Sequence, residues 1–149
     1  MRKPLALRKA RVRERAARPF VPENLFRALS DPTRLRLLNL MGDRETCVCY
    51  FIEILRMSQP KISRHLAYLR RAGIAAARRH GKWIYYRVVS PENEVAASIL
   101  RATIRHLRRD PAMQRDLDHL NAACCAPQKF VLLQGAPQPV KISLQNFHS

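Results

Sequence analysis

SQPKISRHLAYLRRAG, residues 58–73, carries the clearest indication of how this chain folds. Ser58 can accept hydrogen bonds from the free amides at a helix start, and the proline two residues later suits a first helical turn. Gly73 is a common helix stop. Apolar residues recur at i, i+4 and i+7 and define one buried face: Ile62, Leu66 and Leu69. The opposite face is polar and basic, which is typical of a helix that lies in a DNA groove.

Three helical segments are expected ahead of this helix, over residues 22–29, 31–42 and 45–57. Asp31 followed by Pro32 favours a helix start, and Gly42 favours its end. The third segment contains a pair of cysteines and stops just before the DNA-reading helix. Two helices with a short break, the second basic on its outer face, are typical of a helix-turn-helix.

The pattern changes after Gly73. Residues 74–79 and 82–89 predict two strands, the second rich in β-branched and aromatic residues, joined at His80-Gly81. This hairpin would project four basic side chains from its tip: Arg78, Arg79, His80 and Lys82. The sequence therefore predicts a mainly α fold with a small β-hairpin wing (α+β), namely a winged helix-turn-helix.

Two more helices are expected after the wing. Ser90-Pro91 opens one that runs to about residue 109, and Asp110-Pro111 opens the last. Helices outside the DNA-reading part commonly supply dimer contacts, so a homodimer is expected. The predicted organisation has three parts: a basic flexible arm at 1–19, a winged helix-turn-helix DNA-binding and dimerisation domain at 20–122, and a cysteine pair with a loose tail at 123–149.

The charge is strongly lopsided. The chain has 28 Lys and Arg against 11 Asp and Glu, a formal net charge of +17, which predicts attraction to polyanions. Nucleic acid is a better expectation than membrane, because no apolar run approaches the roughly 20 residues of a spanning helix. The amino terminus also lacks the pattern of a secretory signal, so a cytoplasmic location is expected.

The DNA-reading helix offers two kinds of contact. Four residues near its amino end lie within reach of base edges: Gln59, Ser63, Arg64 and His65. Five other residues suit phosphates, which set register and affinity without reading sequence: Lys61, Arg71, Arg78, Arg79 and Lys82. Double-stranded operator DNA is the expected partner.

Four cysteines form two tight pairs, Cys47-Val48-Cys49 and Cys124-Cys125. Thiolates with no obvious histidine partner select soft, thiophilic ions. Residues i and i+2 point about 200° apart on a regular helix. If the first pair opens a helix, one ion can bridge it only when the first turn is distorted, which would disturb the helix packed behind the DNA-reading one.

Two segments of the sequence resemble a known protein family. Residues 46–88, TCVCYFIEILRMSQPKISRHLAYLRRAGIAAARRHGKWIYYRV, resemble the arsenic-responsive repressors of the ArsR/SmtB family. Residues 28–38, ALSDPTRLRLL, resemble that family's second helix and its start. The resemblance covers roughly residues 23–90 and implies a bacterial, homodimeric winged-helix repressor. Such a repressor releases operator DNA when trivalent arsenic or antimony binds its cysteine thiolates.

Trivalent arsenic and antimony take three sulfurs, and the first pair supplies two. In the family's pattern a third cysteine follows three residues after the second, where this chain has Ile52. The favoured hypothesis is a composite site of Cys47, Cys49 and one or both of Cys124 and Cys125, within or across protomers. Two separate dithiolate sites are the alternative.

Other hypotheses for the function of the cysteines also follow from the sequence. A structural zinc site is a poor fit to CxC with CC, and the acids and histidines of the last helices are not convincingly spaced: His106, which is expected at the surface, Asp116, Asp118 and His119. Cadmium, lead or zinc response and a thiol redox switch remain alternatives. An enzyme is not expected, because no base and oxyanion site accompany a cysteine nucleophile, and no organic cofactor is expected.

Overall fold

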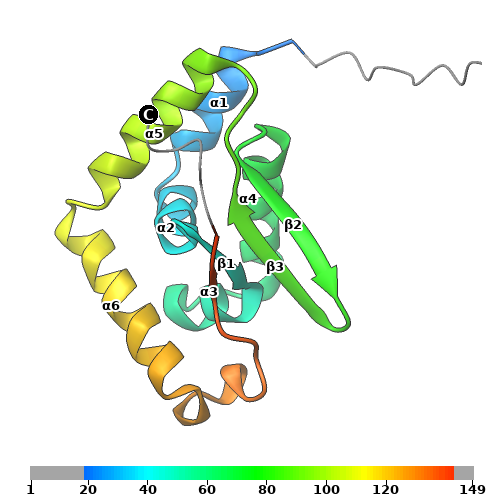
Figure 1. The fold of residues 1–149 in the computed structure, drawn as a ribbon, viewed down its shortest axis with the longest axis vertical. Coiled ribbons are helices and arrows are strands. Elements are labelled where there is room, and N and C mark those ends of the chain that lie inside the picture. The colour runs from blue at the N-terminus through cyan, green and yellow to red at the C-terminus, as the bar shows by residue number, and fades with distance from the viewer. Residues whose placement is uncertain (1–18, 143–149) are drawn as a thin grey trace, which may run out of the picture.

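The computed structural model of the protein describes residues 19–142. Almost all of the predicted basic arm at 1–19 lies outside the described residues, as do residues 143–149. The elements follow one another along the chain (Figure 1): α1 Pro22–Leu29, α2 Pro32–Met41, β1 Arg44–Cys47, α3 Val48–Leu55, α4 Gln59–Arg71, β2 Ala75–His80, β3 Trp83–Val88, α5 Glu94–Leu107, α6 Pro111–Cys125, the 3-10 turns η1 Pro127–Lys129 and η2 Val131–Leu133, and β4 Val140–Lys141.

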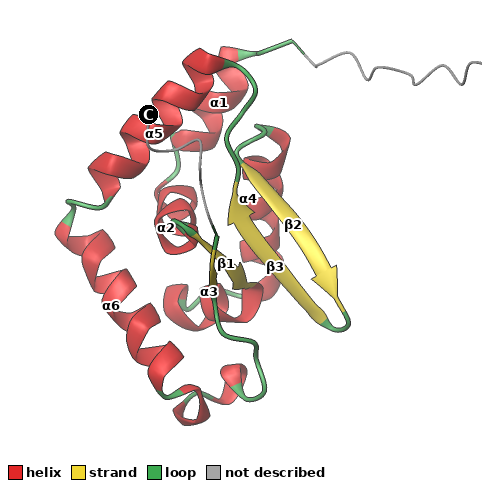
Figure 2. Ribbon diagram, viewed as in Figure 1, coloured by secondary structure: helices red, strands yellow, loops and turns green. Residues whose placement is uncertain are grey.

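The winged helix-turn-helix fold is confirmed. Helices α3 and α4 pack against each other, and the antiparallel hairpin β2–β3 follows α4 (Figure 2). The predicted stripe of α4 is fully buried, with 0% exposure at Ile62, Leu66 and Leu69. Asp31 caps α2 by accepting a hydrogen bond from the Arg34 amide at 2.9 Å. Helix α2 is buried around most of its circumference and forms the centre of the core.

The expected helical start at residue 45 is wrong. Residues Arg44–Cys47 form strand β1, in which Thr46 pairs with Tyr86 and Cys47 pairs with Tyr85 of the hairpin. Four residues carry too little periodicity to reveal a strand, and pairing with a distant strand decides the local conformation. The cysteine pair therefore sits at a strand-to-helix junction, where the sheet meets α3.

The expected loose tail is also wrong as far as residue 142. Leu133 is fully buried and η2 packs on α3, while β4 pairs with β1 and completes a sheet of order β2-β3-β1-β4. Gln138 Nε2 donates to the Cys124 carbonyl at 2.7 Å. We call residues 126–142 the C-terminal strap, because they run from the end of α6 back across α3 to β1 (Figure 1).

Helix α5 begins later than expected, and polar contacts hold α6 on α2. The cap of α5 is Asn93, whose side chain accepts from the Ala96 amide at 3.0 Å, so the expected start at Ser90-Pro91 is wrong. Helix α6 is held on α2 by polar contacts: Arg36 donates two hydrogen bonds to Asp116 at 2.6 and 2.8 Å, and Asn39 Nδ2 donates to the Met113 carbonyl at 2.9 Å. These contacts fix the helix that carries the second cysteine pair.

Within residues 19–142, no helix has both the length and the apolar character that crossing a bilayer requires.

Candidate functional site: a basic reading surface beside a thiol pair

The outer face of α4 carries the side chains predicted to read DNA. Gln59, Lys61 and Arg64 are exposed, whereas Ser63 and His65 are half-buried. His65 Nδ1 lies 3.5 Å from Asp31 Oδ1, so one ring nitrogen already faces the start of α2. The structure therefore leaves the first turn of α4 open to a partner and ties its middle to α2.

Tyr68, which is not among the residues predicted to contact DNA, orients two arginines at the C-terminal end of α4. The guanidinium carbons of Arg34 and Arg71 lie 4.7 and 4.8 Å from the centre of the Tyr68 ring. Arg34 also donates to the Ala28 and Arg27 carbonyls at 2.7 and 2.6 Å, which satisfies the end of α1. Tyr68 thus holds Arg71 on the exposed face, and its position on the polar side of the helix is visible in the sequence.

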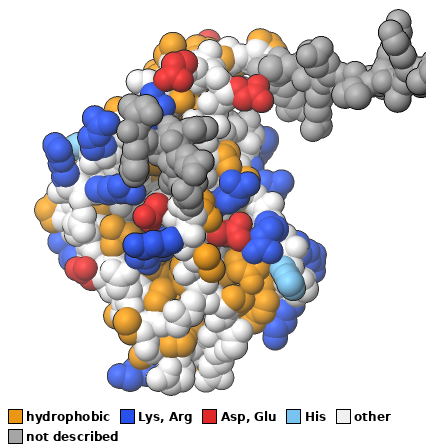
Figure 3. All heavy atoms as spheres, viewed as in Figure 1, with side chains coloured by type: hydrophobic (Ala, Val, Ile, Leu, Met, Phe, Trp, Pro, Cys, Tyr) orange, Lys and Arg blue, Asp and Glu red, His pale blue; other side chains and the backbone are white. Residues whose placement is uncertain are grey.

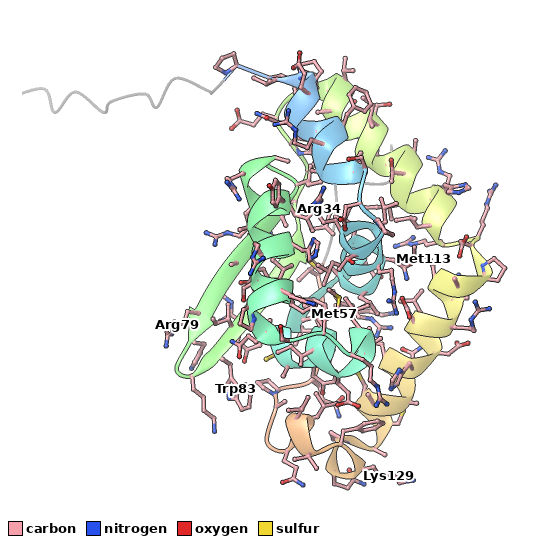
Figure 4. All side chains as sticks on the ribbon, turned by 180° about the vertical axis from the view of Figure 1, so that it is seen from behind. Arg34, Met57, Arg79, Trp83, Met113 and Lys129 are labelled. Atoms are coloured by element: carbon pink, nitrogen blue, oxygen red, sulfur yellow. The ribbon has the colours of Figure 1, made fainter. Side chains whose placement is uncertain are left out.

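The hairpin presents the predicted basic wing. Arg78, Arg79, His80 and Lys82 are all exposed, and basic side chains surround the hairpin's outer end (Figure 3). Arg79 projects from the outer end of the wing (Figure 4) and its Nε donates to the Gly81 carbonyl at 3.2 Å. The Lys82 ammonium lies 4.9 Å from the centre of the Trp83 ring. The wing and the face of α4 together form a surface rich in donors for phosphate oxygens.

The thiols of Cys47 and Cys49 are already together. Their sulfurs lie 2.8 Å apart, and both residues are buried, at 1% and 9% exposure. Cys47 is the extended N-cap of α3, at φ −65° and ψ 142°, so the helical separation of about 200° does not apply to this pair. The expectation that the first turn must be distorted to bridge the pair is therefore wrong.

The two thiols differ in their affinity for protons. The pKa of Cys47 falls to about 7, chiefly because the Cys49 thiol donates to its sulfur; burial opposes this effect, and backbone N–H groups that include Ile84 of the wing add to the lowering. The pKa of Cys49 is raised by the same shared proton and by burial. The pair therefore holds one thiolate and one thiol near neutral pH, and thiolate is the form that binds soft ions.

This asymmetry predicts a titration. Thiolate absorbance in the ultraviolet should grow by one step centred near pH 7 in the folded, reduced protein, and Cys47→Ser should remove that step. Cys49→Ala should move the step upward toward pH 9, because it removes the hydrogen bond from Cys49, which is the largest cause of the low pKa. A step unchanged in Cys49→Ala would show that the pair does not share a proton.

Tyr50 lies near three of the four cysteines, and its sequence position alone does not predict this. Its hydroxyl is buried with no hydrogen-bond partner of good geometry. The pKa of Tyr50 rises to about 12, first through burial and then through the electrostatic effect of the cysteine sulfurs of Cys124, Cys49 and Cys47. Burial also raises the pKa of Cys124, whose sulfur lies beside the Tyr50 hydroxyl. Tyr50 thus marks the polar space between the first pair and Cys124.

The third sulfur is close to the pair but not joined to it. Cys124 is half-buried at the end of α6, while Cys125 is exposed. Within the part of the chain that the structure describes, no three His, Cys, Asp or Glu side chains lie close enough to hold one metal ion. The donors present fit two of the three ligand positions of a trivalent thiophilic ion.

The side chains considered as zinc ligands bind other residues or lie apart from one another. Asp116 is held by Arg36, His119 lies against the Phe130 ring at 6.0 Å between ring centres, and His106 is exposed as expected. These side chains do not converge.

Comparison with known proteins gives consistent relatives. The profile described as "Bacterial regulatory protein, arsR family" matches residues 31–77. An arsenic resistance transcriptional regulator of Pseudomonas putida, ArsR1, is 52% identical over 70 residues, which are 46% of this chain and 55% of that protein. The arsenical resistance operon repressor of Escherichia coli is 48% identical over 70 residues, 46% of this chain and 60% of that one.

A third relative extends over a longer stretch. A second arsenic resistance transcriptional regulator of Pseudomonas putida, ArsR2, is 38% identical over 115 residues, which cover 71% of this chain and 99% of that protein. By contrast, the chain matches little more than half the length of the other two relatives. The near-complete match to ArsR2, together with the profile match over α2 to β2, assigns this chain to the arsR family of bacterial regulatory proteins.

Proposed function

We propose that the protein is a homodimeric transcriptional repressor that binds operator DNA and releases it when trivalent arsenic or antimony binds cysteine thiolates. The observation that carries the proposal is the buried Cys47–Cys49 pair, whose sulfurs lie 2.8 Å apart at the junction of the sheet and α3. The pair is thus linked to both parts of the DNA-reading unit: Cys47 of β1 pairs with Tyr85 of the wing, and α3, which carries Cys49, packs on the DNA-reading helix α4. A repressor of this kind works in the bacterial cytoplasm.

The exposed face of α4 and the wing support operator binding. Arg64 and Lys61 are both exposed on α4, and we assign Arg64 to a guanine edge and Lys61 to phosphate. We expect Arg64→Ala to weaken binding of the operator by about 1–3 kcal/mol while weakening binding of unrelated DNA much less. Lys61→Ala should weaken both by a similar factor and reduce the salt slope by about one. Fluorescence anisotropy with both DNAs at several salt concentrations measures this, and equal behaviour of the two variants would contradict the assignment.

Exposed apolar side chains support the dimer. Phe26 of α1 and Val95 of α5 are 55% and 61% exposed, and their helices lie at the same end of the molecule, away from the tip of the wing (Figure 1). Large apolar side chains exposed together mark contact surfaces. We expect Phe26→Glu to shift the sedimentation equilibrium toward monomer, with Val131→Glu, at another exposed apolar site, leaving it unchanged.

The ion site is proposed as composite. Cys47 and Cys49 supply two sulfurs, and we propose Cys124 as the third, because its sulfur lies beside the hydroxyl of Tyr50, the residue that follows Cys49. Cys124 must move toward the pair to complete the site, since the three sulfurs are not grouped in the described structure. Cys125 is an exposed neighbour that can substitute for it. A partner protomer can supply the same donor.

The test is operator release measured for single cysteine variants. Reduced, metal-free protein bound to labelled operator is titrated with arsenite and with antimonite. Cys124→Ser should weaken the response and Cys125→Ser should leave most of it. If neither substitution changes the response, singly or combined, the composite site is wrong. Parallel titrations with cadmium, lead and zinc separate an arsenic-responsive repressor from one that answers to divalent ions.

A redox switch is the second candidate, because a thiolate faces a thiol at 2.8 Å. Hydrogen peroxide would take two electrons and the one proton of the thiolate–thiol pair and a second proton from solvent, so that the O–O bond breaks, a Cys47–Cys49 disulfide forms and two waters leave. Release by peroxide in the presence of chelator, with arsenite inactive, would favour this candidate over the ion site.

A further inference from the structure

An acidic residue next to the thiol pair holds the wing. Glu45 lies two residues before Cys47 on β1, and its Oε1 accepts hydrogen bonds from Nη2 and Nε of Arg78 at 2.6 and 3.1 Å. Arg87 Nε of β3 lies 3.9 Å from the other carboxylate oxygen. The Glu45 side chain is 15% exposed, whereas that of Arg78 is 52% exposed. A mostly buried carboxylate on the cysteine strand therefore binds an exposed arginine of the wing.

The strand register places these residues in one row. Cys47 is directly opposite Tyr85 of β3, and Tyr85 is directly opposite Arg78 of β2. Side chains that face each other across antiparallel strands lie on the same side of the sheet and contact one another. The Arg78 guanidinium carbon lies 4.4 Å from the centre of the Tyr85 ring. The Cys47 thiol, the Tyr85 ring and the Arg78 guanidinium thus lie on three adjacent strands. The hydrogen bonds from Arg78 to Glu45 link β2 directly to β1.

Arg78 differs from Arg79 and Lys82, the basic residues beside it at the outer end of the wing. Arg79 and Lys82 contact neighbours within the hairpin turn, namely the Gly81 carbonyl and the Trp83 ring. Arg78 is instead bound to a strand outside the hairpin, so its position follows β1. Since Arg78 is also placed to contact phosphate, a shift of β1 changes a DNA contact directly.

We propose that Glu45 is the positioning residue that transmits occupancy of the thiol pair to the wing. An ion that binds both sulfurs must part them from their 2.8 Å contact, which displaces the end of β1, and Glu45 moves Arg78 with it, away from its phosphate. This inference rests on the proposed function and adds the route by which the ion reaches the DNA contact.

Glu45→Gln tests the route, because it keeps the size of the side chain and removes the charge that holds Arg78. We expect the variant to bind arsenite as the wild type does. The ratio of operator affinities without and with arsenite should fall about fivefold or more, toward unity, given that such couplings commonly span about 5–150-fold. Glu94→Gln is the matched control: it removes an equal charge and an ion pair to Arg101 at 2.9 Å on α5, and should leave the ratio unchanged.

A double-mutant cycle identifies the partner. In an Arg78→Gln background, Glu45→Gln should have no further effect on the release ratio, because the residue through which it acts is gone. A loss of the same size in both backgrounds would overturn the assignment to Arg78.

Trp83, the only tryptophan, gives a readout that does not depend on DNA. It opens β3 at the wing, so arsenite should change its emission in the wild type and not in Glu45→Gln. If Trp83 responds in this way but arsenite leaves operator affinity unchanged, the route stands and the proposed function fails. If arsenite releases wild type and Glu45→Gln by the same factor and Trp83 responds in both, the route is overturned while the proposed function stands.

Discussion

Cys47→Ser should keep full operator affinity and lose release by arsenite. The wild type is expected to lose operator affinity by about 5–150-fold when the ion binds, and the variant should show a ratio close to one. The physical reason is that the substitution removes both the low-pKa thiolate and one of the two sulfurs that already converge. Operator anisotropy in reduced, chelated samples, with and without arsenite, measures the ratio.

The control for this prediction is Cys125→Ser. It makes the same chemical change at an exposed thiol, so most of the release should survive. Cys49→Ser should behave like Cys47→Ser, since either change leaves a single sulfur at the strand-to-helix junction. A Cys47→Ser protein that still releases operator at the wild-type arsenite concentration would remove the pair from the mechanism.

Leu133→Ala should destabilise the protein by about 2–5 kcal/mol, as expected for truncation of a fully buried leucine. Leu133 lies in η2 of the C-terminal strap, which packs on α3, the helix that carries Cys49. The loss should appear as a lower urea midpoint, with helix content followed by circular dichroism.

Leu132→Ala is the matched comparison, because the adjacent leucine is 52% exposed. It should change the free energy of unfolding by no more than about 0.5 kcal/mol. Equal, small effects of the two substitutions would mean that the strap is not docked in solution. A docked strap, by contrast, makes the C-terminal segment part of the thiol site, since Gln138 also binds the carbonyl of Cys124.

Much of the DNA-reading unit was predictable, because its signals are local. The buried stripe of α4, the Asp31 cap of α2 and the turn at Gly81 each follow from residues close in sequence. The two strands of the wing lie within about one residue of the predicted ranges.

The parts that were missed depend on contacts between distant residues. Strand β1 exists because Thr46 and Cys47 pair with the hairpin, and the strap docks through single apolar side chains without periodicity. The same holds at the site: Tyr50 and Glu45 gain their roles from Cys124 and Arg78, which are far from them in sequence. Their local sequence carries no sign of these partners.

The central claim is that ion occupancy of the Cys47–Cys49 pair lowers operator affinity. The most direct test is one titration of reduced wild-type protein on labelled operator, in which arsenite binding and anisotropy are followed in the same sample. Anisotropy should fall in step with arsenite binding. Saturation of the protein with arsenite at constant anisotropy would show that ion binding does not release the operator.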